Sequence, residues 1–251
     1  MKKLVLAAAT AAACSAQIAL ADDALPPPDN VVSYNVGIAS DYRYRGISQS
    51  RLEPALQGGA DYTNNPTGFY LGTWLSTIKW IKDAGGNDDV EWDLYGGKRG
   101  NITKDISYDV GVLSYVYPGN DLAPIVGFSN ANTTEVYGQL GFGPAYIKYS
   151  HAVTNLFGFV DSKNSGYLDI GANIDMGSGF TANLHAGHQK VANHSVADYN
   201  DWKLGVTKDF GFMTGALAVI GTDADEVAYA SPANGKFMGK NALVLTLTKT
   251  F

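Results

Sequence analysis

The final eleven residues, 241–251, alternate between apolar and polar side chains and end on an aromatic residue. Leu243, Leu245 and Leu247 fall on one face of an extended strand and threonines on the other, because successive strand side chains point to opposite sides. A strand of a membrane-spanning barrel needs this alternation, with apolar groups toward lipid. We therefore expect Leu243, Leu245, Leu247 and Phe251 to form a barrel-assembly signal, with Phe251 at the membrane interface. An ordinary half-buried terminal strand is the alternative.

The first 21 residues have the features of a secretory signal peptide. Two lysines precede an apolar segment, and Ala19-Leu20-Ala21 is an A-x-A cleavage signal. Cleavage between Ala21 and Asp22 would discard Cys14, the only cysteine, so the mature chain would have no thiol for a disulfide, a metal or a nucleophile. Lipidation of Cys14 is the alternative.

The predicted mature chain is acidic. Removing Lys2 and Lys3 from the 18 basic residues leaves 16 against 24 acidic ones, a net charge of −8, whereas nucleic-acid binding needs a basic surface. No mature segment approaches the roughly 18–20 apolar residues of a spanning helix. A mature chain that crosses a membrane must then do so as a closed barrel, the other structure that satisfies every backbone group in lipid.

Turn residues divide the chain into about twelve expected strands that form one barrel domain, residues 31–251, after a proline-rich periplasmic lead-in at 22–30. The expected strands are 31–45, 52–63, 68–79, 90–98, 104–117, 132–142, 144–152, 166–176, 180–189, 199–208, 212–222 and 239–251. Tight connections alternate with longer ones along the chain. This order predicts an all-β fold, a transmembrane antiparallel up-and-down β-barrel with short periplasmic turns and longer extracellular loops.

Aromatic residues concentrate near the ends of the expected strands, as two belts at the membrane interfaces require. One group lies near the tight turns or the chain end: Tyr62, Phe69, Tyr108, Phe142, Phe180, Phe212 and Phe251. The other group lies toward the longer loops: Tyr42, Tyr44, Trp92, Tyr115, Tyr117, Tyr149 and Trp202.

Alternation also assigns charged side chains to the lumen. Lipid-facing Tyr42 and Tyr44 would direct Asp41, Arg43 and Arg45 inward near the outer mouth. The two arginines would either form a constriction or anion contact, or pair with lumenal carboxylates and lock neighbouring strands. The pore-lining candidates are Asp41, Arg43, Arg45, Glu91, Asp93, Asp109, Glu135, Lys148, Asp169, Asp175, Asp201 and Lys203, with Asp61 as a further acidic position. Acidic candidates outnumber basic ones, which predicts a weak cation preference.

The histidines do not suggest a metal site or a catalytic site. His185 and His188 are three residues apart, so they fall on opposite faces of a strand and cannot bind one ion together. No Ser, His and Asn group can be placed together by spacing, although a triad can assemble between strands. We expect no metal, no cofactor and no enzymatic activity, and keep an outer-membrane enzyme such as a phospholipase as an alternative.

Four segments resemble a bacterial family. Residues 40–50, S-D-Y-R-Y-R-G-I-S-Q-S, resemble the opening signature of the TorF-like porin family, and E-W-D-L-Y at 91–95, Y-V-Y-P-G at 115–119 and E-V-Y at 135–137 follow in that family's order. The resemblance spans nearly the whole mature chain. It implies an outer-membrane β-barrel and brings neither catalytic residues nor a substrate.

The sequence therefore predicts a bacterial outer-membrane porin through which small hydrophilic, charged solutes diffuse passively. Twelve strands fall between small barrels that side chains fill and large barrels with wide channels. A non-conducting structural or adhesive surface barrel is thus the first alternative. The expected partners are outer-membrane lipid, the barrel-assembly machinery and small solutes, without nucleic acid, and the sequence leaves the oligomeric state open.

Overall fold

The structure is a computed structural model that describes residues 28–251. The predicted signal peptide, its cleavage site at Ala21 and Asp22, and most of the lead-in at 22–30 lie outside the described residues. Within residues 28–251, no helix is long and apolar enough to cross a membrane.

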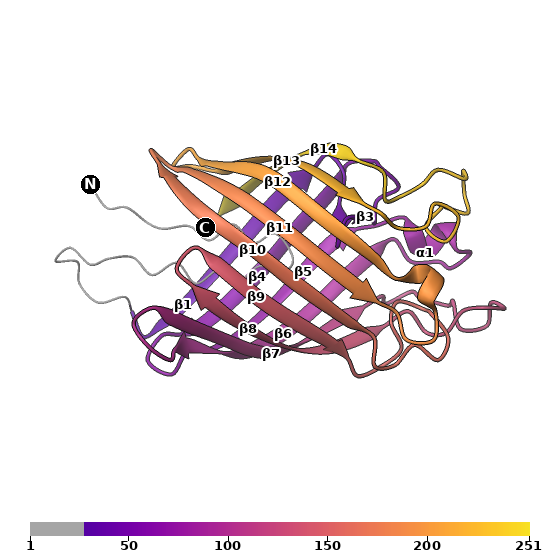
Figure 1. The fold of residues 1–251 in the computed structure, drawn as a ribbon, viewed down its shortest axis with the longest axis horizontal. Helices are drawn as coiled ribbons and strands as arrows, with labels where there is room; N and C mark the ends of the chain where they lie inside the picture. The colour runs from indigo at the N-terminus through magenta and orange to yellow at the C-terminus, as the bar shows by residue number, and fades with distance from the viewer. Residues whose placement is uncertain (1–27) are drawn as a thin grey trace.

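Twelve antiparallel strands close into a barrel, which confirms the predicted fold (Figure 1). Neighbouring strands follow chain order, and the last strand pairs with the first, from Asn35 opposite Thr250 to Ala39 opposite Thr246. The barrel strands are β1 (Asn30–Ala39), β4 (Ala55–Asn64), β5 (Phe69–Thr77), β6 (Val90–Asn101), β7 (Ile106–Val116), β8 (Thr133–Phe142), β9 (Ala145–Ala152), β10 (Gly166–Gly177), β11 (Phe180–Lys190), β12 (Tyr199–Asp209), β13 (Thr214–Thr222) and β14 (Ala242–Thr250).

The connections differ between the two ends of the barrel, as predicted. Tight turns join β4 to β5, β6 to β7, β8 to β9, β10 to β11 and β12 to β13 at one end, the short-turn end. The other end, the long-loop end, carries α1 (Trp80–Asp83) and the 3-10 helix η1 (Ser195–Ala197) (Figure 1). Phe251 lies at the short-turn end, where its N–H donates to the carbonyl of Tyr34 over 2.8 Å. The terminal residue therefore continues the seam that closes the barrel.

The outer face of the barrel is apolar. Leu243 and Leu245 on β14 are 64% and 46% exposed, and similar side chains alternate along the other strands. Aromatic residues of the short-turn group lie exposed on this face, as do three of the long-loop group: Tyr62, Phe69, Phe142, Phe180, Phe212 and Phe251, then Trp92, Tyr149 and Trp202. Tyr108 of the short-turn group is half-buried. The prediction of outward aromatics at both ends is confirmed for the exposed residues.

The expected strand at 31–45 is wrong beyond Ala39. Residues 40–50, here called the inner hairpin, turn into the barrel, where β2 (Arg43–Tyr44) pairs with β3 (Ile47–Ser48). Arg45 and Gly46 at its tip have φ of +46° and +78°, a left-handed conformation that no continuous strand adopts. The prediction of a lipid-facing Tyr42 and Tyr44 fails with it, because both side chains are buried inside the barrel.

The inner hairpin packs into an aromatic core at the long-loop end. The ring centroids of Tyr42 and Trp74 are 5.4 Å apart, and those of Tyr44 and Tyr115 are 5.3 Å apart. Tyr115 and Tyr117 are therefore interior residues as well, and their predicted place in an outer belt is wrong. Other buried members come from α1 and the long loops: Ile78, Ile81, Leu122 and Ala131. This end of the lumen is filled by side chains.

Candidate functional site

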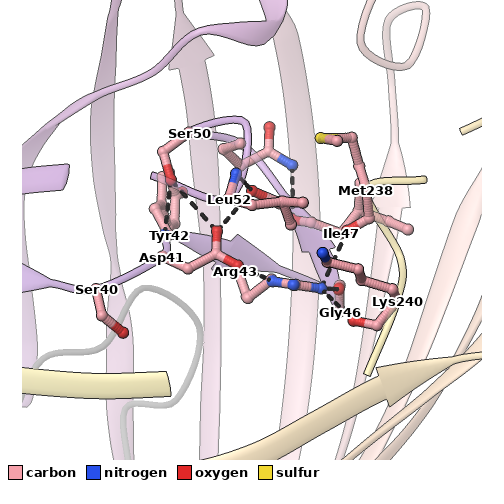
Figure 2. Close-up of polar contacts among 12 residues, drawn as sticks. Ser40, Asp41, Tyr42, Arg43, Gly46, Ile47, Ser50, Leu52, Met238 and Lys240 are labelled. Atoms are coloured by element: carbon pink, nitrogen blue, oxygen red, sulfur yellow. Dashed lines mark hydrogen bonds and ion pairs between the residues drawn. The ribbon is translucent and has the colours of Figure 1, made fainter. Parts of the chain in front are cut away.

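The base of the inner hairpin is fixed by Asp41 and Arg43 (Figure 2). Asp41 accepts hydrogen bonds from the hydroxyls of Ser48 and Ser50, and its Oδ2 lies 2.6 Å from Arg43 Nε. Arg43 Nη1 donates to the carbonyls of Gly46, Met238 and Lys240 over 2.9–3.0 Å. Asp41 and Arg43 thus tie the inner hairpin to itself and to the loop before β14. They do not project from a strand of the barrel wall as the sequence predicted.

The tip of the inner hairpin places Arg45 against the opposite wall. Its Nη2 donates to Glu135 Oε2 over 2.7 Å, and its Nη1 donates to Gln189 Oε1 over 2.7 Å. The guanidinium carbon lies 4.2 Å from the ring centroid of Tyr167 and 4.7 Å from that of Tyr44. The predicted pairing of an arginine with a lumenal carboxylate is therefore confirmed for Arg45 and Glu135.

The three carboxylates of β6 and β8 meet the inner hairpin in different ways. Glu91 accepts the hydroxyl of Tyr42, and that of Tyr117 over 2.8 Å, instead of pairing with an arginine. Asp93 Oδ1 and Glu135 Oε1 are buried and have no hydrogen-bond partner within residues 28–251. Because a buried acceptor normally has a partner, these two oxygens mark unused binding capacity in the wall.

His185 belongs to an interior cluster that the sequence interpretation missed. Its Nδ1 lies 2.8 Å from Asp169 Oδ1 and its Nε2 lies 2.7 Å from Asp201 Oδ2. Both aspartates face Gly187 across neighbouring strands, and a glycine there leaves room for the Tyr167 hydroxyl, which donates to Asp201 over 2.7 Å. Only the pairing register of β10, β11 and β12 brings these residues together. The sequence does not show this register, and each residue alone fits an ordinary lumen position.

His188 lies on the other face of β11, as predicted, with its Nδ1 2.9 Å from Asn200 Oδ1. The two histidines therefore do not share a site. Among residues 28–251, no group of three or more His, Asp or Glu side chains is arranged to hold a metal ion.

The short-turn half of the lumen is lined by tyrosines and carboxylates. The Tyr70 hydroxyl donates to Asp109 over 2.6 Å, and the Tyr95 hydroxyl donates to Asp61 over 2.6 Å. Lys148 Nζ lies 4.1 Å from the ring centroid of Tyr137.

Two more of the predicted pore-lining residues lie on β12 and β10. Lys203 is half-buried on β12, opposite His185 of β11. Asp175 is exposed near the end of β10, where it accepts the N–H of Gly177 over 2.8 Å.

A closed barrel with an apolar outer face, a polar interior and long loops at one end has the architecture of porin-like outer-membrane barrels. Residues 24–251 match the family described as a bacterial protein of unknown function (Gcw_chp), and the chain belongs to this family. That description does not include the TorF-like name suggested by residues 40–50, which stays a prediction. No curated protein matches the chain.

Solved structures share the fold at low sequence identity. A structure of the NanC porin is 10% identical, with a TM-score of 0.54 over 88% of this chain and 99% of that one. A chain from a study of in-meso crystallization of membrane proteins is 8% identical, with a TM-score of 0.50 over 88% of this chain and 83% of that one. LpxR from Salmonella typhimurium is 12% identical, with a TM-score of 0.41 over 87% of this chain and 99% of that one. The first two similarities show the fold alone.

Proposed function

We propose that this protein is a constricted outer-membrane channel for passive diffusion of small hydrophilic solutes, with a weak preference for cations and no chemical step. Its working partners are then membrane lipid, which covers the outer face, and the solutes themselves. In such a channel, selectivity comes from the pore diameter and the charges that line it.

The observation that carries this proposal is the charge of the inward face. Carboxylates point inward from strands around the barrel: Asp61, Glu91, Asp93, Asp109, Glu135, Asp169 and Asp201. Fewer cations share this face of the barrel strands, namely Arg99, Lys148 and Lys203, besides the titratable His185. A lumen lined with excess negative charge concentrates cations and repels anions.

The inner hairpin supplies the constriction. It leaves the wall after β1 and reaches the opposite wall at Glu135 and Gln189, so it crosses the lumen at the long-loop half. Any solute that enters from that end must pass this segment or move it. The proposal therefore predicts small or infrequent openings for the intact protein.

Planar-bilayer recordings in a salt gradient test this function. We would compare the refolded protein with a variant in which residues 41–50 are replaced by a Gly/Ser linker of equal length. Defined openings of the intact protein with a cation-selective reversal potential support the proposal, and the linker variant should conduct more. Anion selectivity, or silence of the intact protein after verified insertion, would overturn it.

A non-conducting surface barrel is the second candidate, and the aromatic core at the long-loop end favours it. Tyr42, Tyr44, Tyr115 and Tyr117 are all under 10% exposed, which leaves little free space around them. This candidate predicts that the intact protein is silent in bilayer recordings. The channel proposal predicts instead that the intact protein opens and lets solutes pass.

A further inference from the structure

We propose that Glu135, Gln189 and Tyr167 form a binding site for the guanidinium group of a permeating solute, and that Arg45 of the inner hairpin occupies this site in the closed barrel. A guanidinium-bearing solute then competes with Arg45 and releases the tip of the inner hairpin. This inference names a substrate class for the proposed channel and rests on that function.

The wall offers three groups that together fit a planar guanidinium. Glu135 supplies a carboxylate, Gln189 an amide carbonyl and Tyr167 an aromatic face, and they project from β8, β11 and β10. Guanidinium groups bind carboxylates and carbonyls through N–H donors in one plane and stack on aromatic rings. An ammonium group is a compact point charge and lacks this planar fit. The arrangement therefore favours guanidinium over a simple amine.

Wall contacts hold Gln189 and Tyr167 in place without the inner hairpin. Gln189 Nε2 donates to the carbonyls of Gly166 and Lys190, each over 3.1 Å, so the amide oxygen points at the guanidinium. The Tyr167 hydroxyl is fixed by its bond to Asp201. Removal of Arg45 would thus leave an oriented amide oxygen and a fixed aromatic ring beside the buried Glu135 carboxylate, and preorganisation of these two groups lowers the cost of binding.

Arg45 does not use the full binding capacity of the site. It reaches Glu135 through Oε2 alone, and Glu135 Oε1 is buried without a hydrogen-bond partner among the described residues. Oδ1 of Asp93, on β6, is also buried without a hydrogen-bond partner among the described residues. A free guanidinium is not restrained by a backbone, so it can bind a carboxylate through two parallel N–H···O bonds. These unpartnered oxygens are the independent sign that the wall is built for a ligand other than Arg45.

The inner hairpin is built so that its tip can leave. Only two residue pairs join β2 to β3, Arg43 with Ser48 and Tyr44 with Ile47. Arg45 itself has a φ of +46°, which is strained for a residue with a Cβ atom, and withdrawal of the tip relieves this strain. Because Arg45 is tethered beside the site, its effective concentration there is on the order of millimolar or higher, and a free solute must compete with it.

Binding is tested on the refolded full-length protein with the Arg45→Ala substitution. Methylguanidinium is titrated by calorimetry, and N-methylurea serves as its neutral isostere. We expect methylguanidinium to bind at least about tenfold tighter, because charge-assisted hydrogen bonds are stronger than neutral ones, and to raise the thermal midpoint. Adding Glu135→Gln should abolish this binding. Equal affinity for the two probes, or binding unchanged by Glu135→Gln, overturns the inference.

Arg45→Lys provides a second variant if Arg45→Ala does not refold. It keeps a positive charge but loses the planar donor pattern, so methylguanidinium should displace the substituted lysine at lower concentrations than it displaces Arg45 in the native protein. Displacement at the same concentration in both proteins contradicts the proposal.

Permeation is tested on the native protein by swelling of proteoliposomes. L-arginine should enter several-fold faster than L-lysine, which carries the same net charge, whereas a general cation preference predicts equal rates. Equal rates overturn the substrate class. If methylguanidinium binds Arg45→Ala but no variant conducts, the proposed channel fails while the guanidinium site stands. If channels conduct without selective binding, the channel stands and this inference fails.

Discussion

Gly46 gives the sharpest test of whether the inner hairpin closes the barrel. A Cβ atom added to Gly46 would lie 2.3 Å from Thr222 Cγ2 and 2.8 Å from Asp201 Cβ, and its φ is +78°. A left-handed conformation costs alanine about 1–2 kcal/mol, and overpacking costs about 1–3 kcal/mol more. Gly46→Ala should therefore disfavour the inserted tip by about 2–5 kcal/mol. At about 1.4 kcal/mol per tenfold, the ratio of inserted to withdrawn tips falls roughly 30-fold to several thousand-fold.

Single-channel recordings measure this shift directly. We expect Gly46→Ala to open more often or more widely than the native protein, with its fold checked by the heat-dependent gel mobility of refolded barrels. Gly143→Ala is the matched control. Gly143 also has a positive φ, +58°, but no atom lies within 4 Å of the added Cβ, and it belongs to a tight turn at the short-turn end. This variant should conduct like the native protein.

A second substitution separates steric exclusion from backbone strain. Thr222→Ser removes the Cγ2 atom that the new methyl group meets and keeps the hydroxyl, which donates to the Gly239 carbonyl over 3.0 Å. In the Gly46→Ala background it should restore part of the closed population. A folded Gly46→Ala protein with native conductance would refute the role of the inner hairpin as the constriction, and a double variant identical to Gly46→Ala would refute the steric argument.

Two further predictions concern other parts of the structure. His185→Ala leaves its two aspartate partners without a shared donor, so it should lower the free energy of unfolding in urea by about 1–3 kcal/mol. His188→Ala, on the outer face, should change this free energy little. Equal effects of the two substitutions would contradict a stabilising role of the His185 cluster. Burial raises the pKa of the Asp83 carboxyl, but hydrogen bonds from Arg51 and Ser231 outweigh it, so the pKa is lowered. A lowered folded-state pKa stabilises the fold above the ordinary value near about 4, and that contribution is lost as pH falls through the folded pKa. Native protein and Asp83→Asn should differ in thermal midpoint at neutral pH and converge in acid, and a constant difference would refute this linkage.

The barrel could be predicted because its signals are local. Apolar and polar side chains alternate within single strands, and turn residues separate one strand from the next. Both patterns are confirmed, for example in β10, where Leu168 and Ile170 are exposed and Asp169 is buried inside. Strand ends were predicted less well where the chain leaves the wall, because alternation continues past Ala39 without a break in the sequence pattern.

The inner hairpin could not be predicted for a physical reason. Inside a plugged barrel both faces of a segment are buried, so the alternation of Asp41 to Arg45 does not distinguish lipid from lumen. The contacts that hold the tip join residues far apart in the chain, such as Arg45 and Gln189, and follow from barrel closure rather than from spacing. The local signal was Gly46, whose missing side chain fits a sharp turn against β12 and β13.

The tyrosines explain how an acidic lumen is held together in part by donors that carry no positive charge. Asp61, Asp109 and Asp201 each accept a hydrogen bond from a tyrosine hydroxyl on another inward strand position. A tyrosine hydroxyl satisfies a carboxylate oxygen but adds no positive charge, whereas an arginine or lysine would both bind the oxygen and cancel its field. Tyrosines at inward strand positions therefore serve as lumenal donors. A lumen built this way keeps its excess of acidic groups, which is the property that a cation-preferring channel requires.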